Sequence, residues 1–218
     1  QEDLMDNISI IIRNRNEAEF IGFAIQSCLD HFKKPEIIIV DNKSTDDSLE
    51  IVNLFKDRTT IKIISIDDYT PGKSINMGVK HCSNDYVLIL SAHAQITNMN
   101  LERVVMHFKN KNVAVFGNQT PIYRGKKISK RYIWSHFSED ETLDMYSDIE
   151  QRYFLHNAFC FYEKAILVNK PMPEQYPGKE DRYWANDMID KHQHYIYEPY
   201  ISVNHFYTGN GATWKGIG

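Results

Sequence analysis

The chain is built from short apolar runs that alternate with polar turns and amphipathic stretches. The clearest run is Ile37–Val40, four β-branched residues that stop at Asp41. A short apolar run bounded by polar residues is typical of a parallel strand buried on both faces. Similar runs predict strands at 8–12, 61–66, 86–90, 113–116 and 157–162, and a shorter strand at 195–198.

Between these runs, apolar residues recur at helical spacing. In the first such stretch Ile21, Ile25, Leu29 and Phe32 fall on one face. Comparable spacing predicts helices at about 17–32, 48–56, 71–80, 101–108 and 182–191, and a short one that ends near 168. Strands and helices therefore alternate from the start, as in a parallel sheet with right-handed crossovers. We predict an α/β fold with a mostly parallel central sheet flanked by helices, in a single domain of 218 residues.

The regular pattern stops at Gly117. Residues 118–152 mix basic, aromatic and acidic positions, so we expect a variable insertion rather than part of the core. The domain would then have a first half of about 1–117 and a second half of about 118–218. Its end, 203–218, is rich in glycine and carries His205 and Trp214. It is expected to be either a lid that orders on ligand binding or a frayed end.

Polar residues follow directly after three of the predicted strands. The first strand ends in Arg13-Asn14-Arg15-Asn16, the second in Asp41, and the fourth in Ser91-Ala92-His93. In open α/β sheets, ligands bind outside the carboxyl ends of the strands. Asp41 is therefore placed to accept hydrogen bonds from a ligand, and the loop after the first strand would face the same ligand. The alternative for Asp41 is that it only caps the turn that follows.

A lysine stands at the start of the predicted helix that opens with Pro71-Gly72-Lys73-Ser74. The helix dipole disfavours a positive charge there, which suggests an anionic partner such as a phosphate. A solvated lysine is the simpler alternative. The four residues also resemble the end of a phosphate-binding P-loop, but Asp67 stands where such a loop requires glycine. This excludes a P-loop NTPase.

Charge and composition narrow the classes of partner. The net charge of −4 argues against binding nucleic acid through overall charge. Basic residues do cluster at 124–131, which is either a solvated surface or a contact to an anionic membrane or a phosphorylated lipid acceptor. The apolar runs fall well short of the roughly 20 residues that span a bilayer. The first seven residues, QEDLMDN, are acidic and unlike a signal peptide, and the missing Met suggests a trimmed start.

The three cysteines, Cys28, Cys82 and Cys160, are widely spaced among apolar neighbours. An odd number of this kind predicts buried free thiols rather than disulfides or a metal site. Free thiols are typical of a reducing compartment, so we expect the cytoplasm.

Five motifs together resemble the GT-A fold glycosyltransferases of family 2, in particular bacterial members that make surface polysaccharides. They are IIIRNRNEAEFI (10–21), IIIVDNKSTDDSLEI (37–51), PGKSINMG (71–78), LILSAHA (88–94) and KEDRYWA (179–185). With the residues between them they cover about 8–205. The second and last motifs, in this order and spacing, are the more specific.

The resemblance implies roles for particular residues. The donor nucleotide would be held by Asp41 at the base, by Arg13, Asn14, Arg15 and Asn16 around the base and ribose, and by Lys73 and Asn76 near the base and diphosphate. Asp181 would be the general base, with Glu180 as the second candidate. The reaction would be inverting: the base takes a proton from an acceptor hydroxyl, which attacks the anomeric carbon as the nucleoside diphosphate leaves.

One motif departs from the family. Most members carry Asp-x-Asp after the fourth strand to hold Mg²⁺ or Mn²⁺ against the diphosphate, whereas Ser91-Ala92-His93 stands here, as in some other members. Three readings follow. His93 binds a metal such as Mn²⁺ together with His205; Ser91 and His93 hydrogen-bond the diphosphate directly; or the domain binds nucleotide without catalysis. The metal-assisted reading ranks first, since imidazole is an ordinary Mn²⁺ ligand.

We therefore expect an inverting glycosyltransferase of bacterial surface-polysaccharide synthesis. Its donor would be a nucleotide-sugar, UDP-linked by default, and its acceptor a saccharide or a lipid-linked glycan at the cytoplasmic face of the membrane. A catalytically inactive nucleotide-binding module is the first alternative. A sugar nucleotidyltransferase is the second, and it is weakened because the loop after the first strand, RNRNEAE, contains no glycine.

Overall fold

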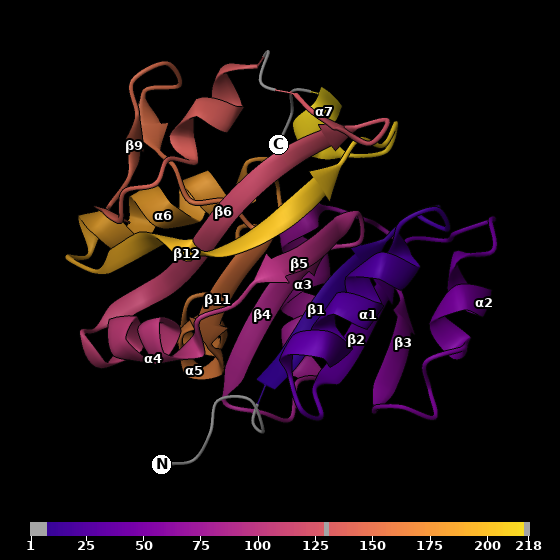
Figure 1. The fold of residues 1–218 in the computed structure, drawn as a ribbon. Helices are drawn as coiled ribbons and strands as arrows, with labels where there is room; N and C mark the ends of the chain where they lie inside the picture. The colour runs from indigo at the N-terminus through magenta and orange to yellow at the C-terminus, as the bar shows by residue number, and fades with distance from the viewer. Residues whose placement is uncertain (1–7, 129–130, 216–218) are drawn as a thin grey trace.

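The computed structural model describes residues 8–128 and 131–215 (Figure 1). Its longer strands are β1 (Ile8–Asn14), β2 (Glu36–Asp41), β3 (Ile61–Ser65), β4 (Tyr86–Ser91), β5 (Ala94–Asn98), β6 (Asn112–Tyr123), β11 (Phe159–Glu163) and β12 (His194–Phe206). Four two-residue strands are β7 (Lys126–Lys127), β8 (Thr142–Leu143), β9 (Tyr146–Ser147) and β10 (Arg152–Tyr153). The helices are α1 (Ile21–His31), α2 (Ser48–Asn53), α3 (Pro71–Lys80), α4 (Leu101–Lys109), α5 (Lys164–Asn169), α6 (Glu180–Asp190), α7 (Ala212–Lys215) and the 3₁₀ helix η2 (Tyr132–His136).

The eight longer strands form one sheet in the order β3-β2-β1-β4-β11-β6-β12-β5. The pairs β3–β2, β2–β1, β1–β4 and β6–β12 are parallel, whereas β11 and β5 run against their neighbours. The predicted α/β fold with a mostly parallel central sheet is therefore confirmed.

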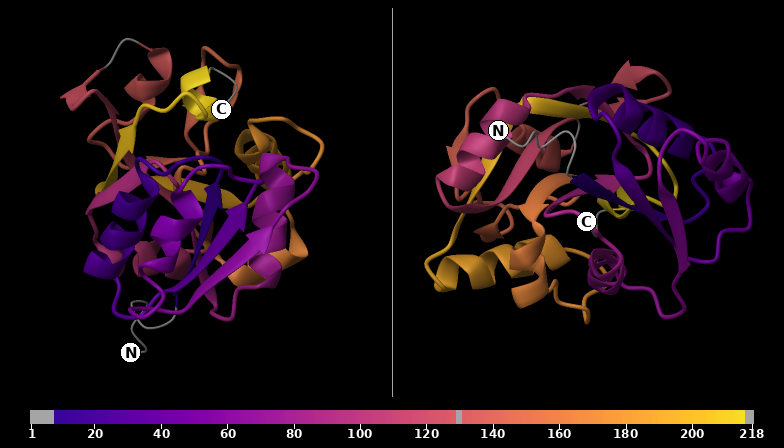
Figure 2. Two further views of the ribbon diagram at one scale, coloured as in Figure 1. Left: turned by 90° about the vertical axis from the view of Figure 1, so that its right-hand side faces the viewer. Right: turned by 90° about the horizontal axis from the view of Figure 1, so that it is seen from below.

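Helices cover both faces of this sheet, as the two further views in Figure 2 show. Successive side chains of a strand point to opposite faces, so Ile10 and Ile12 of β1 pack with residues of α1, α2 and α4. Ile11, between them, packs with residues of α3, α5 and α6 on the other face. The continuous apolar runs of the sequence thus correspond to strands buried on both sides.

The prediction that 118–152 form an insertion outside the core is wrong. Strand β6 continues to Tyr123, and Ile133, Trp134 and Met145 are buried in the core on the α3 side of the sheet. Buried and partly exposed residues do alternate beyond Gly117, but the buried positions are occupied by Gln119 and Pro121. Because neither residue is strongly apolar, the hydrophobic pattern conceals the second half of this strand.

The end of the chain is also more regular than predicted. Strand β12 has 13 residues instead of the expected four, so 203–206 belong to the sheet, and 212–215 form α7. The frayed-end alternative is wrong for 203–215. Strand β5 was not predicted, and α1 begins at Ile21 because 17–20 form a turn.

The other predicted strands and helices begin and end within a few residues of the observed ones. The three cysteines are buried and free, as expected. No helix in the described ranges is long and apolar enough to cross a membrane. The acidic start, 1–7, and two positions of the basic cluster, 129 and 130, lie outside the described residues.

Candidate active site

A cavity of about 530 Å³ opens at the carboxyl ends of β1 and β4. Register explains why the strand-end motifs meet there: Arg13 lies opposite Ser91, and Asn14 lies opposite Asp41. The first turn of α6 and residues 210–215 complete the walls. Of the residues predicted from the sequence, the cavity brings together Arg13, Asn14, Arg15, Ser91, His93, Glu180, Asp181 and His205.

Two carboxylates enter the cavity from the start of α6. Asp181 is 6% exposed, and its oxygens accept hydrogen bonds from the backbone N–H of Asn157 at 2.8 Å and of Arg182 at 2.9 Å. Glu180 lies beside it, with Oε1 3.7 Å from Nη1 of Arg13. The positive end of the helix dipole favours both carboxylates at this position.

The pKa values of Asp181 and Arg13 differ from those of exposed side chains. Burial raises the pKa of Asp181 well above its ordinary value, and the charge of Glu180 raises it further. Burial alone would lower the pKa of Arg13, but Tyr69 and then the two carboxylates outweigh it and raise that pKa. The cavity therefore holds the permanent cation of Arg13 beside a carboxyl group that binds a proton more tightly than an exposed aspartate does.

His93 and His205, which also line the cavity, lie close together, with ring centroids 4.9 Å apart. His93 Nε2 is 3.1 Å from Ser91 Oγ, and its Nδ1 is 3.3 Å from Oε1 of Glu17. His205 is 1% exposed, and its Nε2 has no hydrogen-bond partner among the described residues. Burial lowers the pKa of His205 well below its ordinary value, and His93 lowers it further.

Sequence reasoning missed several residues of this site. Glu17 is buried in the turn after β1, and only its place just beyond a strand-end motif could have indicated a role. Gln119 contacts both His205 and His156, and His156 itself lines the cavity. Burial and, to a smaller extent, the charge of Arg13 lower the pKa of His156 to about 3. Gln119 lies in the stretch that was expected to be irregular, and His156 lies just before a predicted strand, so no pattern marked either residue. Asn157, which holds Asp181, was assigned to a strand.

The end of the chain folds back over the loop that follows β1. Asn210 Nδ2 donates to the carbonyl oxygens of Arg15 at 3.1 Å and Asn16 at 3.2 Å, and Thr208 Oγ1 donates to Glu17 at 3.1 Å. These contacts make 208–210 one rim of the cavity. Whether the segment orders on ligand binding, as the lid alternative holds, stays a prediction.

Five predicted residues lie outside the cavity wall: Asn16, Asp41, Lys73, Asn76 and Ala92. The carboxylate of Asp41 accepts from Asn14 Nδ2 at 2.9 Å and from the N–H and hydroxyl of Ser44, so it caps the turn as the alternative proposed. The side chain of Asn76 bonds both backbone groups of Met172. Lys73 Nζ lies 3.8 Å from Asp68. Their roles toward a nucleotide stay predictions.

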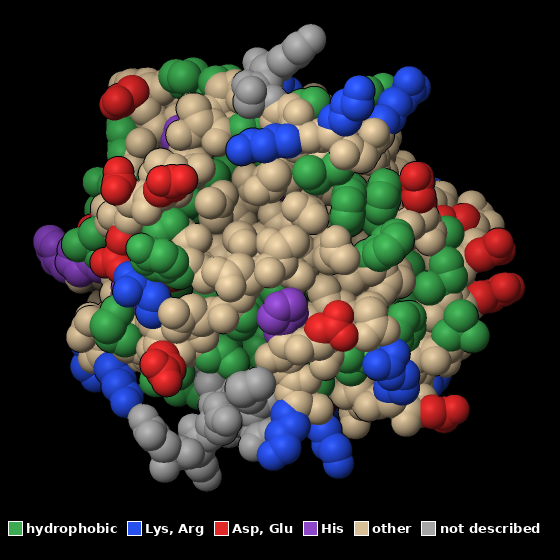
Figure 3. Space-filling model, in the orientation of Figure 1, with side chains coloured by type: hydrophobic (Ala, Val, Ile, Leu, Met, Phe, Trp, Pro, Cys, Tyr) green, Lys and Arg blue, Asp and Glu red, His purple; other side chains and the backbone are tan. Residues whose placement is uncertain are grey.

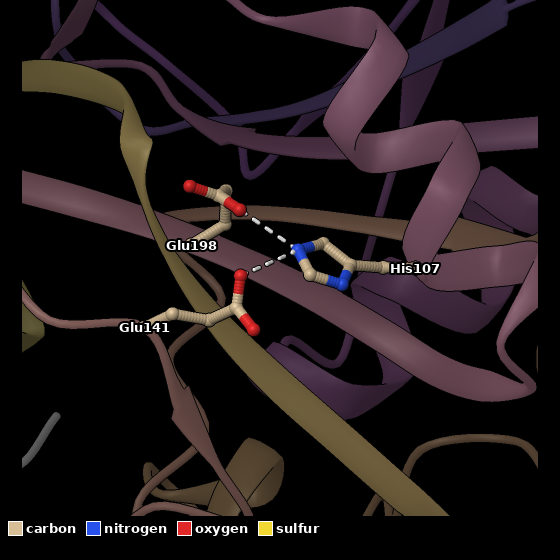
Figure 4. Close-up of side chains that lie close together, drawn as sticks. All are labelled: His107, Glu141 and Glu198. Carbon is tan, nitrogen blue, oxygen red and sulfur yellow. Dashed lines mark hydrogen bonds and ion pairs between the residues drawn. The ribbon is translucent and has the colours of Figure 1, made fainter.

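A second polar cluster lies at the far end of the sheet, formed by His107, Glu141 and Glu198 (Figure 4). His107 Nε2 is 2.8 Å from Glu198 and 3.5 Å from Glu141. Arg103 pairs with both carboxylates at 2.7 Å. Since the guanidinium already supplies the positive charge, this cluster is an ion-pair network that ties α4 to β12.

Comparison with solved structures identifies the fold. The chain superposes on S. aureus TarS with a TM-score of 0.67, at 19% identity, over 90% of this chain and 60% of that chain. It superposes equally well, at 15% identity and over 96% and 59% of the two chains, on the mannosyltransferase PcManGT of Pyrobaculum calidifontis, solved with GDP-Man and Mn²⁺. Both likenesses show the GT-A fold that the sequence predicts.

Curated relatives share more sequence. A GalNAc(5)-diNAcBac-PP-undecaprenol beta-1,3-glucosyltransferase of Campylobacter jejuni is 27% identical over 186 residues, which are 84% of this chain and 60% of that protein. The O-antigen chain rhamnosyltransferase WbaN of Salmonella anatum is 26% identical over 178 residues, which are 78% and 56% of the two chains. The chain thus spans little more than half the length of these relatives.

A family model described as glycosyl transferase family 2 matches residues 9–172. The match contains β1, β2 and β4 with their strand-end residues, and it ends shortly before α6. Since it extends over most of the sequence, the chain belongs to glycosyl transferase family 2.

Proposed function

We propose that this chain is the catalytic unit of an inverting glycosyltransferase. It moves a sugar from a nucleotide-sugar donor to a saccharide or lipid-linked glycan during synthesis of a bacterial surface polysaccharide. The observation that carries the proposal is the position of Asp181, a buried carboxylate with a raised pKa that lines the same cavity as Arg13 and Ser91. A raised pKa makes such a carboxylate a stronger base than an ordinary aspartate, as a general base requires.

The nucleotide end of the donor lies, in this proposal, at the carboxyl ends of β1 and β2. Asn14 has a buried carbonyl oxygen, Oδ1, with no hydrogen-bond partner among the described residues, while its amide group donates to Asp41. Asp41 thus acts through Asn14, whose Oδ1 would accept a hydrogen bond from the nucleobase or the ribose. Arg13 and Arg15 would balance the charge of the diphosphate.

The residues around His93 and His205 fit a divalent cation such as Mn²⁺. His205 offers a buried, unpartnered Nε2, and His93 lies beside it with the carboxylate of Glu17 behind. His93 and His205 would hold the ion, which when bound would neutralise the diphosphate and so favour its departure. The hydroxyl of Ser91 lies 3.1 Å from His93 Nε2 and would turn away from that nitrogen when the ion binds.

The chemical step needs no enzyme nucleophile. Asp181 accepts the proton of an acceptor hydroxyl, whose oxygen forms a bond to the anomeric carbon while the bond to the nucleoside diphosphate breaks on the opposite side. The electron pair leaves with the diphosphate, and the configuration inverts. The N–H groups of Asn157 and Arg182 hold the carboxylate in place. Glu180 and Arg13 set the charge around it.

The donor and acceptor classes rest on similar proteins. TarS has been solved with UDP-GlcNAc and PcManGT with GDP-Man, and we keep UDP as the default. The relatives are named for a polyprenol-linked acceptor and for an O-antigen chain. A lipid-linked acceptor would bring the protein to the membrane from the cytoplasmic side. The exposed Arg124, in the turn after β6, and the exposed Lys126 and Lys127, which form β7, would make that peripheral contact. Basic side chains gather over this end of β6 in Figure 3.

Substitution of Asp181, the proposed general base, tests the proposal. Asp181→Asn should lower transfer by about 10²–10⁴-fold, measured as UDP release from UDP-GlcNAc and UDP-glucose with bacterial lipid extract as acceptor. Binding of UDP, measured by calorimetry, should stay within a few-fold of the unaltered chain.

Asp190→Asn is the matched control, because it makes the same change at an exposed position of the same helix. Turnover retained in Asp181→Asn would remove Asp181 from this role. UDP binding without turnover on any acceptor, by the unaltered chain, would favour the nucleotide-binding module instead.

A further inference from the structure

A backbone amide fixes the tautomer of His156. The N–H of Ala158 points at His156 Nδ1 across 3.4 Å. Since a backbone N–H can only donate, Nδ1 is an acceptor and the ring carries its hydrogen on Nε2. That nitrogen lies 3.4 Å from the hydroxyl oxygen of Thr213, which can accept it.

The tautomer of His156 in turn fixes the orientation of the Gln119 amide. Gln119 is 2% exposed and bridges two histidines, with one end 2.9 Å from His156 Nδ1 and the other 2.7 Å from His205 Nδ1. An acceptor on His156 requires the NH₂ end of Gln119, so its carbonyl oxygen faces His205 and must receive a hydrogen from Nδ1. A neutral imidazole carries one such hydrogen, so the lone pair of His205 is on Nε2.

We propose that Gln119 is a positioning residue, which holds His205 in the tautomer whose Nε2 is free to bind a divalent cation. The inference rests on the proposed function, in which His205 and His93 hold that ion. Its support is independent of any sequence motif: Nε2 of His205 is a buried nitrogen without a hydrogen-bond partner among the described residues, and it belongs to a residue that lines the cavity.

Glu17 plays the matching part for His93. Its Oε1 lies 3.3 Å from Nδ1 of His93, and its own hydrogen bond from Thr208 holds it there. His93 Nδ1 makes no hydrogen bond among the described residues, so the contact is electrostatic. A negative charge this close to Nδ1 favours the hydrogen on that nitrogen and leaves the lone pair on Nε2. The site then presents two imidazole nitrogens as ligands. Nitrogen ligands favour Mn²⁺, Co²⁺ or Zn²⁺ over Mg²⁺, which prefers oxygen.

Nuclear magnetic resonance of the unaltered chain tests the tautomers directly. Long-range ¹H–¹⁵N spectra of ¹⁵N-histidine-labelled protein distinguish the two neutral forms, and His156→Gln and His205→Gln assign the signals. We expect the Nδ1–H form at His205 and the Nε2–H form at His156. An Nε2–H form at His205 would overturn the proposal, whatever the activity of the enzyme.

Three variants test the consequence for metal binding, with Mn²⁺ alone as the probe in calorimetry. Gln119→Met removes the acceptor and should weaken Mn²⁺ binding about 10–100-fold. Gln119→Glu keeps an acceptor for His205 and should retain most of the affinity, which a merely structural role would not predict. Gln95→Met makes the same change on strand β5, which pairs with β12, and should bind Mn²⁺ as the unaltered chain does.

The outcomes separate the inference from the proposed function. Equal Mn²⁺ affinity in Gln119→Met and the unaltered chain would overturn the role of Gln119 alone. Failure of the unaltered chain to bind Mn²⁺ would remove the cation from the proposed function, and this inference with it. Tighter binding of Mg²⁺ than of Mn²⁺ would contradict the assignment of nitrogen ligands. Circular dichroism confirms that each variant is folded.

Discussion

The buried carboxylate of Glu36 should make the stability of the protein depend strongly on acid pH. It opens β2, at the end of the sheet away from the cavity, and is 7% exposed. It accepts hydrogen bonds from Lys62 Nζ at 2.6 Å, from Ser9 Oγ at 2.5 Å and from both the N–H and the hydroxyl of Ser83 at 2.8 Å. Burial alone raises its pKa, but Lys62, Ser83 and Ser9 outweigh burial and lower the pKa to about 2.

The size of the effect follows from this pKa. In the unfolded chain the group titrates near 4.5, and each change of one in pKa corresponds to about 1.4 kcal/mol. The charged form therefore contributes about 3 kcal/mol to the free energy of unfolding at neutral pH. Lys62 is partly exposed, so solvent screens its share and about 2–3 kcal/mol is the expected value. The contribution is fully present above pH 4.5 and is lost as the pH falls toward 2.

Urea-induced unfolding of Glu36→Gln and the unaltered chain measures this contribution. At pH 7 the variant should be less stable by about 2–3 kcal/mol, because glutamine cannot accept from all four donors. By about pH 3 more than half of that difference should be gone. Glu19→Gln, at an exposed position, is the control and should change little at either pH. A difference that is absent at pH 7, or that stays constant down to pH 3, would refute the reasoning.

Two further predictions concern packing and catalysis. Gly78→Ala would place Cβ 2.8 Å from Ile11 Cγ2, so α3 should be pushed from β1 and the free energy of unfolding lowered by about 1–3 kcal/mol. Gly22→Ala, whose Cβ meets Ile51 at an ordinary 3.4 Å, should be neutral or stabilising in the same urea experiment. In the pH profile of kcat/KM, transfer should rise with pH through a pKa well above that of ordinary aspartate, because only deprotonated Asp181 accepts a proton. Glu180→Gln removes a negative neighbour and should move this rise to lower pH, and an unmoved rise would contradict the assignment.

The parallel half of the sheet could be predicted because its residues are apolar on both faces. The runs that became β1, β2 and β4 needed no knowledge of their neighbours. Adjacent parallel strands end at the same edge, so the rule that ligands bind there placed Arg13, Ser91 and His93 in one cavity. These inferences depend on local pattern and simple topology, which the sequence contains.

The second half of the site could not be predicted in this way. Strands β6 and β12 carry polar residues at buried positions, Gln119 and His205, and His205 lines the cavity. A buried polar residue is stable only with partners, and those partners come from distant segments. Pairing of Gln119 with His156 and His205 is a property of the folded chain, which hydrophobic periodicity does not reveal.

The charge near Ser91-Ala92-His93, where most of the family has Asp-x-Asp, is a second feature that the sequence alone does not show. Read along the sequence, Ser91-Ala92-His93 has lost both carboxylates. In the fold, β1 lies directly beside β4, and the turn after β1 brings Glu17, 5% exposed, to 3.3 Å from His93. The negative charge therefore comes from the turn after the neighbouring strand, and it faces Nδ1 of the His93 ring. The residues directly after β4 contain no carboxylate. The cavity nevertheless has one at the same edge of the sheet, because Glu17 lies there.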